Sequence, residues 1–145
     1  MTTTLFDARN PGHQKALGKL ANDHIGWLTT VRSSGRPHSV PVWFLWHDDQ
    51  ILIFSEEKTQ KIRNLHHSGD VVFSLESGQS GSDVAILDGN AVISDQNVTA
   101  WLPAVGEIYG AKYEQGLQYL GLTLDEMAAK YNQAIVVTPT KVTAW

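Results

Sequence analysis

The sequence predicts a mainly β protein with flanking helices, organised as one domain over residues 1–145. Three observations support this fold class. Short segments rich in β-branched and aromatic residues recur along the chain, turn sequences separate them, and few segments show helical periodicity. Because most of the expected strands are joined by short turns, a small antiparallel barrel is favoured over an alternating parallel sheet.

The expected strands are defined by their composition and by the turns between them. Ser33-Ser34-Gly35 and Asp48-Asp49 have the composition of hairpin turns. The predicted strands are Trp27–Arg32, Pro37–Trp46, Gln50–Ser55, Asp70–Glu76, Asp83–Ser94, Ala134–Thr138 and Lys141–Trp145. The segment Val84–Val92 is apolar on both faces, whereas a barrel interior covers only one, so we expect a homodimer.

Three parts of the chain have helical character. A helix is predicted over His13–Asn22 after a Pro-Gly start, and a short one over Thr59–His66 with Ile62 and Leu65 facing inward. The region Val98–Tyr131 is expected to be mostly helical. Within it, Thr123 and Glu126 have the spacing of a capping box that opens its last helix.

Composition excludes several functional classes. The chain has no cysteine, which excludes disulfides, thiolate zinc sites and cysteine nucleophiles and fits a reducing cytoplasm. The N-terminus lacks the basic and apolar regions of a signal peptide, and no apolar run approaches the roughly 20 residues of a spanning helix. A net charge of −4 argues against general nucleic-acid binding. We expect a cytoplasmic protein without nucleic-acid or membrane partners.

The predicted second strand contains a proline between aromatic residues. Val40 and Val42 share one face with Phe44, while Pro41 and Trp43 lie on the other. A strand buried on both sides explains this pattern as well as a binding site does. Proline cannot donate to a strand ladder, however, so Pro41 marks a bulge, an edge or a place where something other than a strand lies alongside. A planar ring is one such neighbour, and Trp43 is the best aromatic candidate to touch it.

The start of the next helix has the character of an anion site. Helix N-termini present unpaired N–H groups and partial positive charge. Hydroxyl groups, an amide and cations surround this start, namely Ser55, Lys58, Thr59, Lys61, Arg63 and Asn64. The alternative is that Glu56 and Glu57 satisfy the helix dipole while the lysines are solvated.

Other chemistry has weaker support in the sequence. His66 and His67 are adjacent, so they point to different sides of a helix, and we expect no metal site. The loop Gly78–Ser82 resembles a nucleophile elbow only loosely, because Ser82 replaces the second glycine. No glycine-rich phosphate loop occurs, and no residue is assigned as catalytic.

The order of these parts resembles a known superfamily. The stretch WLTTVRSSGRPHSVPVWFLWHDDQILIFSEEKTQKIRNLHHSGDVVFSLE is similar to the flavin-binding split-barrel proteins, which are the pyridoxamine 5′-phosphate oxidase-like proteins. The tail, with its AKY helix, GLT turn and PTKV segment, resembles the branch that uses the deazaflavin coenzyme F-420. The resemblance covers nearly the whole chain.

The resemblance implies a six-stranded antiparallel split barrel that forms a homodimer with cofactor sites at the subunit interface. It implies ring contacts from Val40, Pro41, Val42 and Trp43. Phosphate contacts are implied for Ser55, Thr59, Lys61 and Asn64, with Lys58 and Arg63 adding charge. The resemblance also implies that the partner subunit closes the site through the loop near Gln79–Asp83 and the late helices.

These points lead to an expected activity. We expect an oxidoreductase that transfers hydride from reduced F-420 to a small conjugated substrate, with an FMN-dependent reductase or oxidase as the alternative. A non-catalytic cofactor carrier or sensor is the second alternative. True pyridoxamine phosphate oxidases end in a further basic segment, so vitamin B6 oxidation is not expected for a chain that stops at Trp145. Thr59 stands where relatives often have a basic residue, which leaves the choice between FMN and F-420 open.

Overall fold

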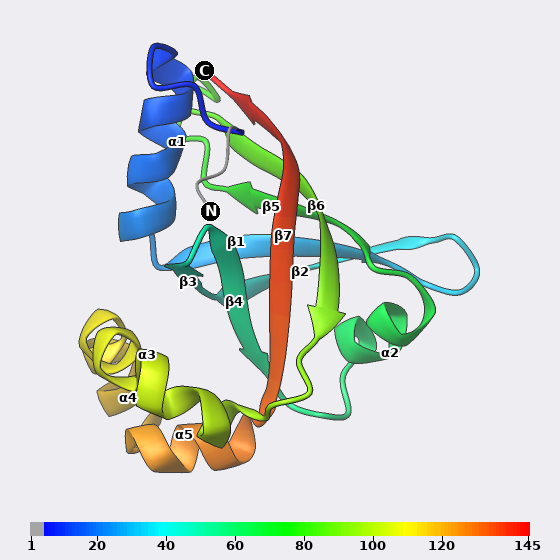
Figure 1. The fold of residues 1–145 in the computed structure, drawn as a ribbon, viewed down its shortest axis with the longest axis vertical. Coiled ribbons are helices and arrows are strands. Elements are labelled where there is room, and N and C mark those ends of the chain that lie inside the picture. The colour runs from blue at the N-terminus through cyan, green and yellow to red at the C-terminus, as the bar shows by residue number, and fades with distance from the viewer. Residues whose placement is uncertain (1–4) are drawn as a thin grey trace.

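The structure is a computed structural model that describes residues 5–145. Twelve elements are assigned within these residues (Figure 1). The helices are α1 (Pro11–Asn22), α2 (Gln60–His67), α3 (Val98–Lys112), α4 (Glu114–Leu120) and α5 (Leu124–Lys130). The strands are β1 (Ile25–Val31), β2 (Pro37–Trp43), β3 (Leu45–His47), β4 (Gln50–Ser55), β5 (Asp70–Leu75), β6 (Ala85–Ile93) and β7 (Gln133–Ala144).

All seven strands belong to one curled antiparallel sheet with the order β2-β1-β5-β6-β7-β4-β3. The two edge strands, β2 and β3, are consecutive in the chain and are separated only by Phe44. The sheet must therefore curl until its two edges approach each other, as the barrel-like arrangement in Figure 1 shows. The fold class is confirmed as mainly β with flanking helices, but the expected number of six strands is wrong.

Two expected strand boundaries also change. The predicted strand Pro37–Trp46 divides at Phe44, where the chain leaves one edge of the sheet and joins the other. The two predicted C-terminal strands form one continuous strand, β7. Its pairing with β6 shifts at Asp88/Gly89, which leaves Thr140 as an extra residue next to Pro139. The bulge accommodates a proline that cannot donate to the ladder.

The local signals in the sequence are confirmed. Asp48 and Asp49 both adopt positive φ, 54° and 58°, as a tight two-residue hairpin between β3 and β4 requires. The helix predicted from His13 begins earlier, at Pro11, and the side chain of Asn10 caps it. Thr123 and Glu126 form the predicted capping box of α5. Residues 98–131 are mostly helical, as expected.

The chain has two hydrophobic cores, which lie on opposite faces of β4. Ile51 and Ile53 point into the barrel with residues of β1, β5, α1 and α2. Leu52 and Phe54 pack against the helical layer formed by α3, α4 and α5. The helices of the same chain therefore cover one outer part of the barrel. No helix within residues 5–145 combines the length and apolar character needed to cross a membrane.

Candidate functional site

A pocket of about 460 Å³ lies between the edge of β2, the start of α2 and the helical layer, and we call it the β2–α2 pocket. Its volume falls in the range of small-molecule sites, roughly 300–1,000 Å³. Its walls are formed by Pro41, Val42, Trp43, Phe54, Ser55, Glu56, Thr59, Lys61, Tyr109, Leu120, Met127 and Tyr131. The pocket thus combines a strand edge, a helix start and an apolar helical wall.

The strand wall is the outer edge of the sheet. Pro41 lies in β2 and is paired with Trp27 of β1 on one side only, because β2 is the last strand in the sheet order. This is one of the positions where a strand tolerates proline. Pro41 is exposed and Trp43 is half-buried, so a flat molecule has access to this edge.

The polar end of the pocket lies where β4 leads into α2. The hydroxyl of Ser55 donates to the carbonyl oxygen of Glu56 at 2.9 Å and lies 3.2 Å from the hydroxyl of Thr59. Thr59 is the N-cap of α2, yet its side chain makes no capping hydrogen bond, and the first turn contains no acidic residue. The first-turn N–H groups thus lack the side-chain acceptor that most helix starts have, which makes this end suited to an anion.

Lys61 adds a positive charge to the same end. Burial lowers the pKa of Lys61, and the nearby Glu56 carboxylate partly opposes that shift. Glu56 lies closer to Lys130, at 4.0 Å. Among residues 5–145, none of the ion pairs within 4 Å includes Lys61. A partly desolvated cation with no carboxylate within 4 Å favours an anionic ligand.

Six of the ten predicted site residues line this pocket: Pro41, Val42, Trp43, Ser55, Thr59 and Lys61. The other four lie elsewhere. Val40 packs against the barrel core, and Lys58 and Arg63 are exposed on the surface. Asn64 is buried, where its Nδ2 donates to Thr30 Oγ1 at 2.9 Å and its Oδ1 accepts from Gln60 at 2.7 Å. The amide of Asn64 therefore joins α2 to the barrel.

None of the residues of the helical wall was among the predicted cofactor-binding residues. Tyr109, Leu120, Met127 and Tyr131 come from three helices and the residue after α5. Nothing in their local spacing indicates a pocket, because their meeting depends on how α3, α4 and α5 pack. Burial raises the pKa of Tyr109, helped by Tyr113 and Tyr131, so the phenol of Tyr109 stays neutral. Its ring lies 4.7 Å from that of Phe54.

Comparisons with known proteins place this chain in a family. A sequence model described as pyridoxamine 5′-phosphate oxidase matches residues 13–145. The chain belongs to the pyridoxamine 5′-phosphate oxidase family. No curated protein matches the sequence of this chain. The family name describes a shared sequence pattern and fold, and does not by itself give the reaction of this member.

Solved structures of pyridoxamine 5′-phosphate oxidase-like proteins share the fold. An F-420 reductase is 23% identical, with a TM-score of 0.64, over 87% of this chain and 94% of that one. A FAD-binding protein from Mesorhizobium loti is 15% identical, with a TM-score of 0.66, over 90% and 91%. The heme storage protein HutZ from Vibrio cholerae is 12% identical, with a TM-score of 0.69, over 88% and 91%. Structural neighbours of this family therefore differ in the molecules they hold.

Proposed function

We propose that this protein is an oxidoreductase that binds a flavin-type cofactor in the β2–α2 pocket, with F-420 as the leading candidate and FMN as the alternative. One observation carries the proposal. The exposed edge at Pro41 and Trp43 and the uncapped start of α2 beside Lys61 line the same pocket. A planar ring fits the first feature and a phosphate group the second.

The residues of the pocket fit such a cofactor. Lys61, Ser55 and Thr59 would hold the phosphate together with the first-turn N–H groups of α2. Trp43 and the edge of β2 would contact the ring, and the helical wall would exclude water from one side of it. Val40, Lys58, Arg63 and Asn64 are not assigned direct contacts in this proposal.

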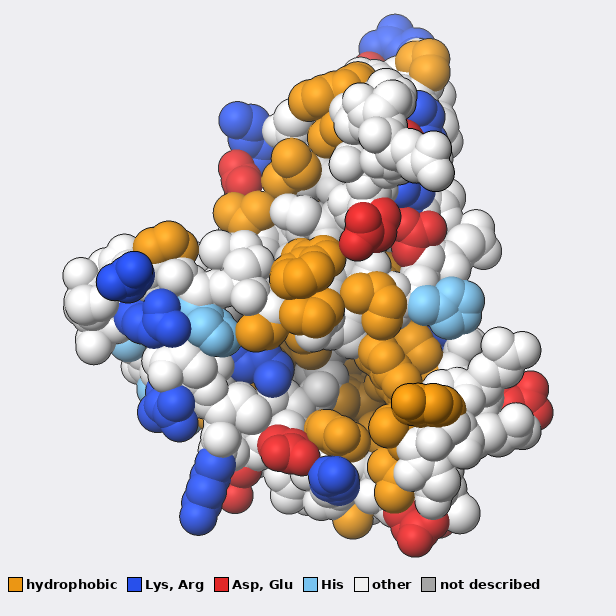
Figure 2. Space-filling model, turned by 180° about the vertical axis from the view of Figure 1, so that it is seen from behind, with side chains coloured by type: hydrophobic (Ala, Val, Ile, Leu, Met, Phe, Trp, Pro, Cys, Tyr) orange, Lys and Arg blue, Asp and Glu red, His pale blue; other side chains and the backbone are white. Residues whose placement is uncertain are grey.

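A group of cations next to Lys61 supports F-420 over FMN. Burial and the charges of Arg32, Lys61 and Arg63 lower the pKa of His38. The Nδ1 atom of His38 is buried without a hydrogen-bond partner. Among the described residues, no carboxylate lies within 4 Å of these basic side chains. Figure 2 shows Lys, Arg and His side chains gathered on the side that carries the β1–β2 hairpin and α2. Such a cluster suits a cofactor with acidic groups beyond its first phosphate, which F-420 has and FMN lacks.

The proposed active form is a homodimer. Ile25 and Trp27 remain 37% and 40% exposed on β1, opposite Trp43 and Pro41 of β2. These four residues extend the strand wall of the pocket into an apolar surface, and Figure 2 shows hydrophobic side chains gathered over the middle of that face. A second copy that covers this surface would bury the apolar side chains and close the pocket.

The bound cofactor would supply hydride-transfer chemistry. The chain itself would orient the ring, keep one side dry and present the neutral Tyr109 hydroxyl to a reduced substrate. The apolar helical wall suits a small conjugated organic substrate better than a charged one.

Titration of the purified chain with F-420 and, separately, with FMN tests the proposal. We expect micromolar or tighter binding of F-420 by fluorescence, with weaker binding of FMN. Substrate-dependent oxidation of bound reduced F-420 would distinguish an enzyme from a carrier. If the protein binds neither F-420 nor FMN, the proposed function is wrong.

A further inference from the structure

Trp43 separates two pockets. One is the β2–α2 pocket. The other, of about 480 Å³, lies between α3, α4 and the segment before β1, with Lys112, Tyr113, Gly116 and His24 among its walls. The two pockets share Trp43 and no other lining residue. The orientation of this indole therefore sets the shape of the strand wall of the β2–α2 pocket.

The backbone next to Trp43 is held by the end of α3 rather than by a strand. Phe44 lies between β2 and β3 and belongs to neither ladder. Its N–H donates to the Tyr113 hydroxyl at 2.8 Å, and its carbonyl oxygen accepts from Lys112 Nζ at 2.7 Å. The Tyr113 hydroxyl also lies 2.6 Å from the carbonyl oxygen of His24. Because Phe44 is fully buried, these bonds replace the strand pairing that its backbone lacks.

The indole itself is held from two directions. The ring of Tyr113 is stacked on that of Trp43, with centroids 4.5 Å apart and planes 2° from parallel. Gly116 lets α4 approach the indole closely, since a Cβ at this position would lie 2.7 Å from Trp43 Cη2 and Cζ2. Any larger residue at position 116 would therefore displace Trp43 or α4.

We propose that Tyr113 and Gly116 are positioning residues, which fix Trp43 as an immobile platform for the cofactor ring. The inference rests on the proposed function, because it names the residues that orient the ring contact of that same site. Of these three residues, only Trp43 would contact the ring. Tyr113 and Gly116 act through it, one by stacking and hydrogen bonding and the other by leaving space.

Two glycine variants test the role of the space at position 116. Gly116→Ala is expected to weaken binding of FMN and of riboflavin, which has the same ring but no phosphate, by the same factor of roughly 3- to 10-fold. The same pair of titrations is made with F-420 and its phosphate-free ring fragment. Gly110→Ala is the matched control, because its Cβ would meet Leu124 at an ordinary 3.8 Å, and we expect wild-type affinities.

A double-mutant cycle separates positioning from a general structural effect. Trp43→Phe removes the indole atoms that face Gly116, so Gly116→Ala is expected to cause no further loss of affinity in that background. Tyr113→Phe keeps the ring but loses the hydroxyl bonds to Phe44 and His24, and we expect it to weaken ring binding as well. Tyr119→Phe is its control, since Tyr119 is 90% exposed.

The ligand-free protein supplies a further readout. With 5-fluorotryptophan in all five tryptophan positions, Trp43→Phe assigns the fluorine resonance of Trp43. Gly116→Ala and Tyr113→Phe should move that resonance and leave the others in place. Unchanged resonances, additive losses in the cycle or wild-type affinity in Gly116→Ala would each overturn the inference. If the wild type binds no ligand, the proposed function fails, and the fluorine spectra alone then support or overturn the positioning of Trp43.

Discussion

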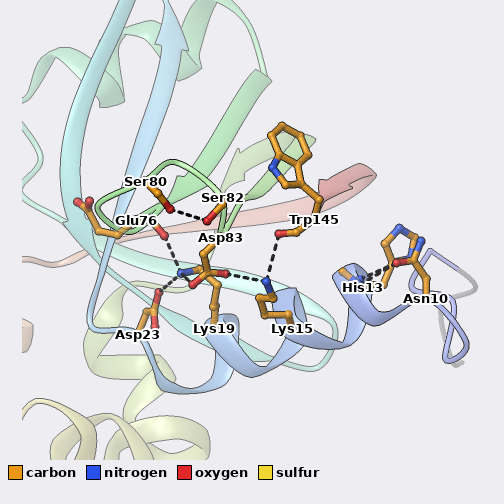
Figure 3. Close-up of polar contacts among 11 residues, drawn as sticks. Asn10, His13, Lys15, Lys19, Asp23, Glu76, Ser80, Ser82, Asp83 and Trp145 are labelled. Atoms are coloured by element: carbon orange, nitrogen blue, oxygen red, sulfur yellow. Dashed lines mark hydrogen bonds and ion pairs between the residues drawn. The ribbon is translucent and has the colours of Figure 1, made fainter.

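The lysines of α1 and the cations around α2 differ in what neutralises them. Lys19 donates to the carbonyl oxygen of Glu76 at 2.6 Å and lies 3.3 Å from Asp83 and 3.4 Å from Asp23 (Figure 3). Lys15 reaches the other oxygen of Asp83 at 3.6 Å. Lys61, in contrast, is partly buried at a pocket and has no carboxylate within 4 Å among residues 5–145; Glu56, which acts on its charge, lies farther away.

The difference separates two uses of positive charge in one chain. Around α1, carboxylates and carbonyl groups of the protein satisfy the lysines, so their charge joins α1 to the loop before β6. At α2, no carboxylate of residues 5–145 lies within 4 Å of Lys61, so this cation beside an uncapped helix start can pair with an anionic ligand. Replacing the same residue type in both regions therefore separates stability from binding.

Lys61→Met should have the largest effect on binding. We expect loss of about 1.5–3 kcal/mol of cofactor affinity, the range for a hydrogen bond to a charged group. The free energy of unfolding should stay constant or rise, because the substitution removes a partly desolvated charge. Fluorescence titration and thermal unfolding measure the two quantities. Lys58→Met, at an exposed position, is the control, and an unchanged dissociation constant for Lys61→Met would show that the phosphate lies elsewhere.

Lys19→Met should show the opposite pattern. We expect a loss of about 1.5–2 kcal/mol in the free energy of unfolding, in the lower part of the range for charged hydrogen bonds because its carboxylate partners are partly exposed. Cofactor affinity should be unchanged. Denaturant unfolding with a parallel titration measures both. Lys15→Met affects a more exposed ion pair and should lower the free energy of unfolding by less. A loss of cofactor affinity in Lys19→Met would contradict the difference between the lysines of α1 and Lys61.

Lys112 differs from both Lys19 and Lys61, because its Nζ lies over the face of an aromatic ring, 3.9 Å from the centroid of Phe44. Burial lowers its pKa to about 8, against the opposing charge of Asp23. Between pH 8 and 10 the unfolded chain therefore binds more protons than the folded chain, and stability should rise with pH by about 1 kcal/mol after allowance for solvent screening.

Unfolding by urea at several pH values measures this rise, which Lys112→Met should abolish. The rise ends near pH 10. Burial raises the pKa of Tyr109 and Tyr113 in the folded chain, so above this pH only the unfolded chain loses their protons, and the free energy of unfolding then falls. Stability that falls between pH 8 and 10 in the wild type, or rises equally in Lys112→Met, would contradict this assignment.

His38 gives the smallest expected effect. Its pKa is lowered by burial and by three nearby cations, and an anionic ligand group beside it would raise that pKa again. Binding would then take up protons, so affinity for F-420 should increase by about two- to threefold as pH falls from 7 to 6. Titrations of the wild type and His38→Asn at both pH values measure this. Equal pH dependence in both proteins would place the acidic groups away from His38.

Much of the fold was predictable because its signals are local. The two aspartates of the β3–β4 turn and the capping box at Thr123 follow from backbone conformation and hydrogen-bonding capacity alone. Pro41 indicated a bulge, an edge or a non-strand neighbour, and the order of the strands shows that it lies on an edge strand. The clustering of Ser55, Thr59 and Lys61 followed from their nearness in sequence. The placement of Asn64 did not, because helical spacing puts it beside Lys61, and only the packing of α2 on β1 directs its amide to Thr30.

By itself, the sequence determined where strands turn, where helices begin and which segment brings Ser55, Thr59 and Lys61 together, since these depend on a few neighbouring residues. Tertiary structure decided the rest of the site. The division of a strand at Phe44, the apolar wall from three helices and the hold of Tyr113 on Trp43 all depend on distant parts of the chain. Tyr113 and Trp43 are 70 positions apart. Such contacts depend on how the curled sheet and the helical layer pack together, which no local pattern encodes.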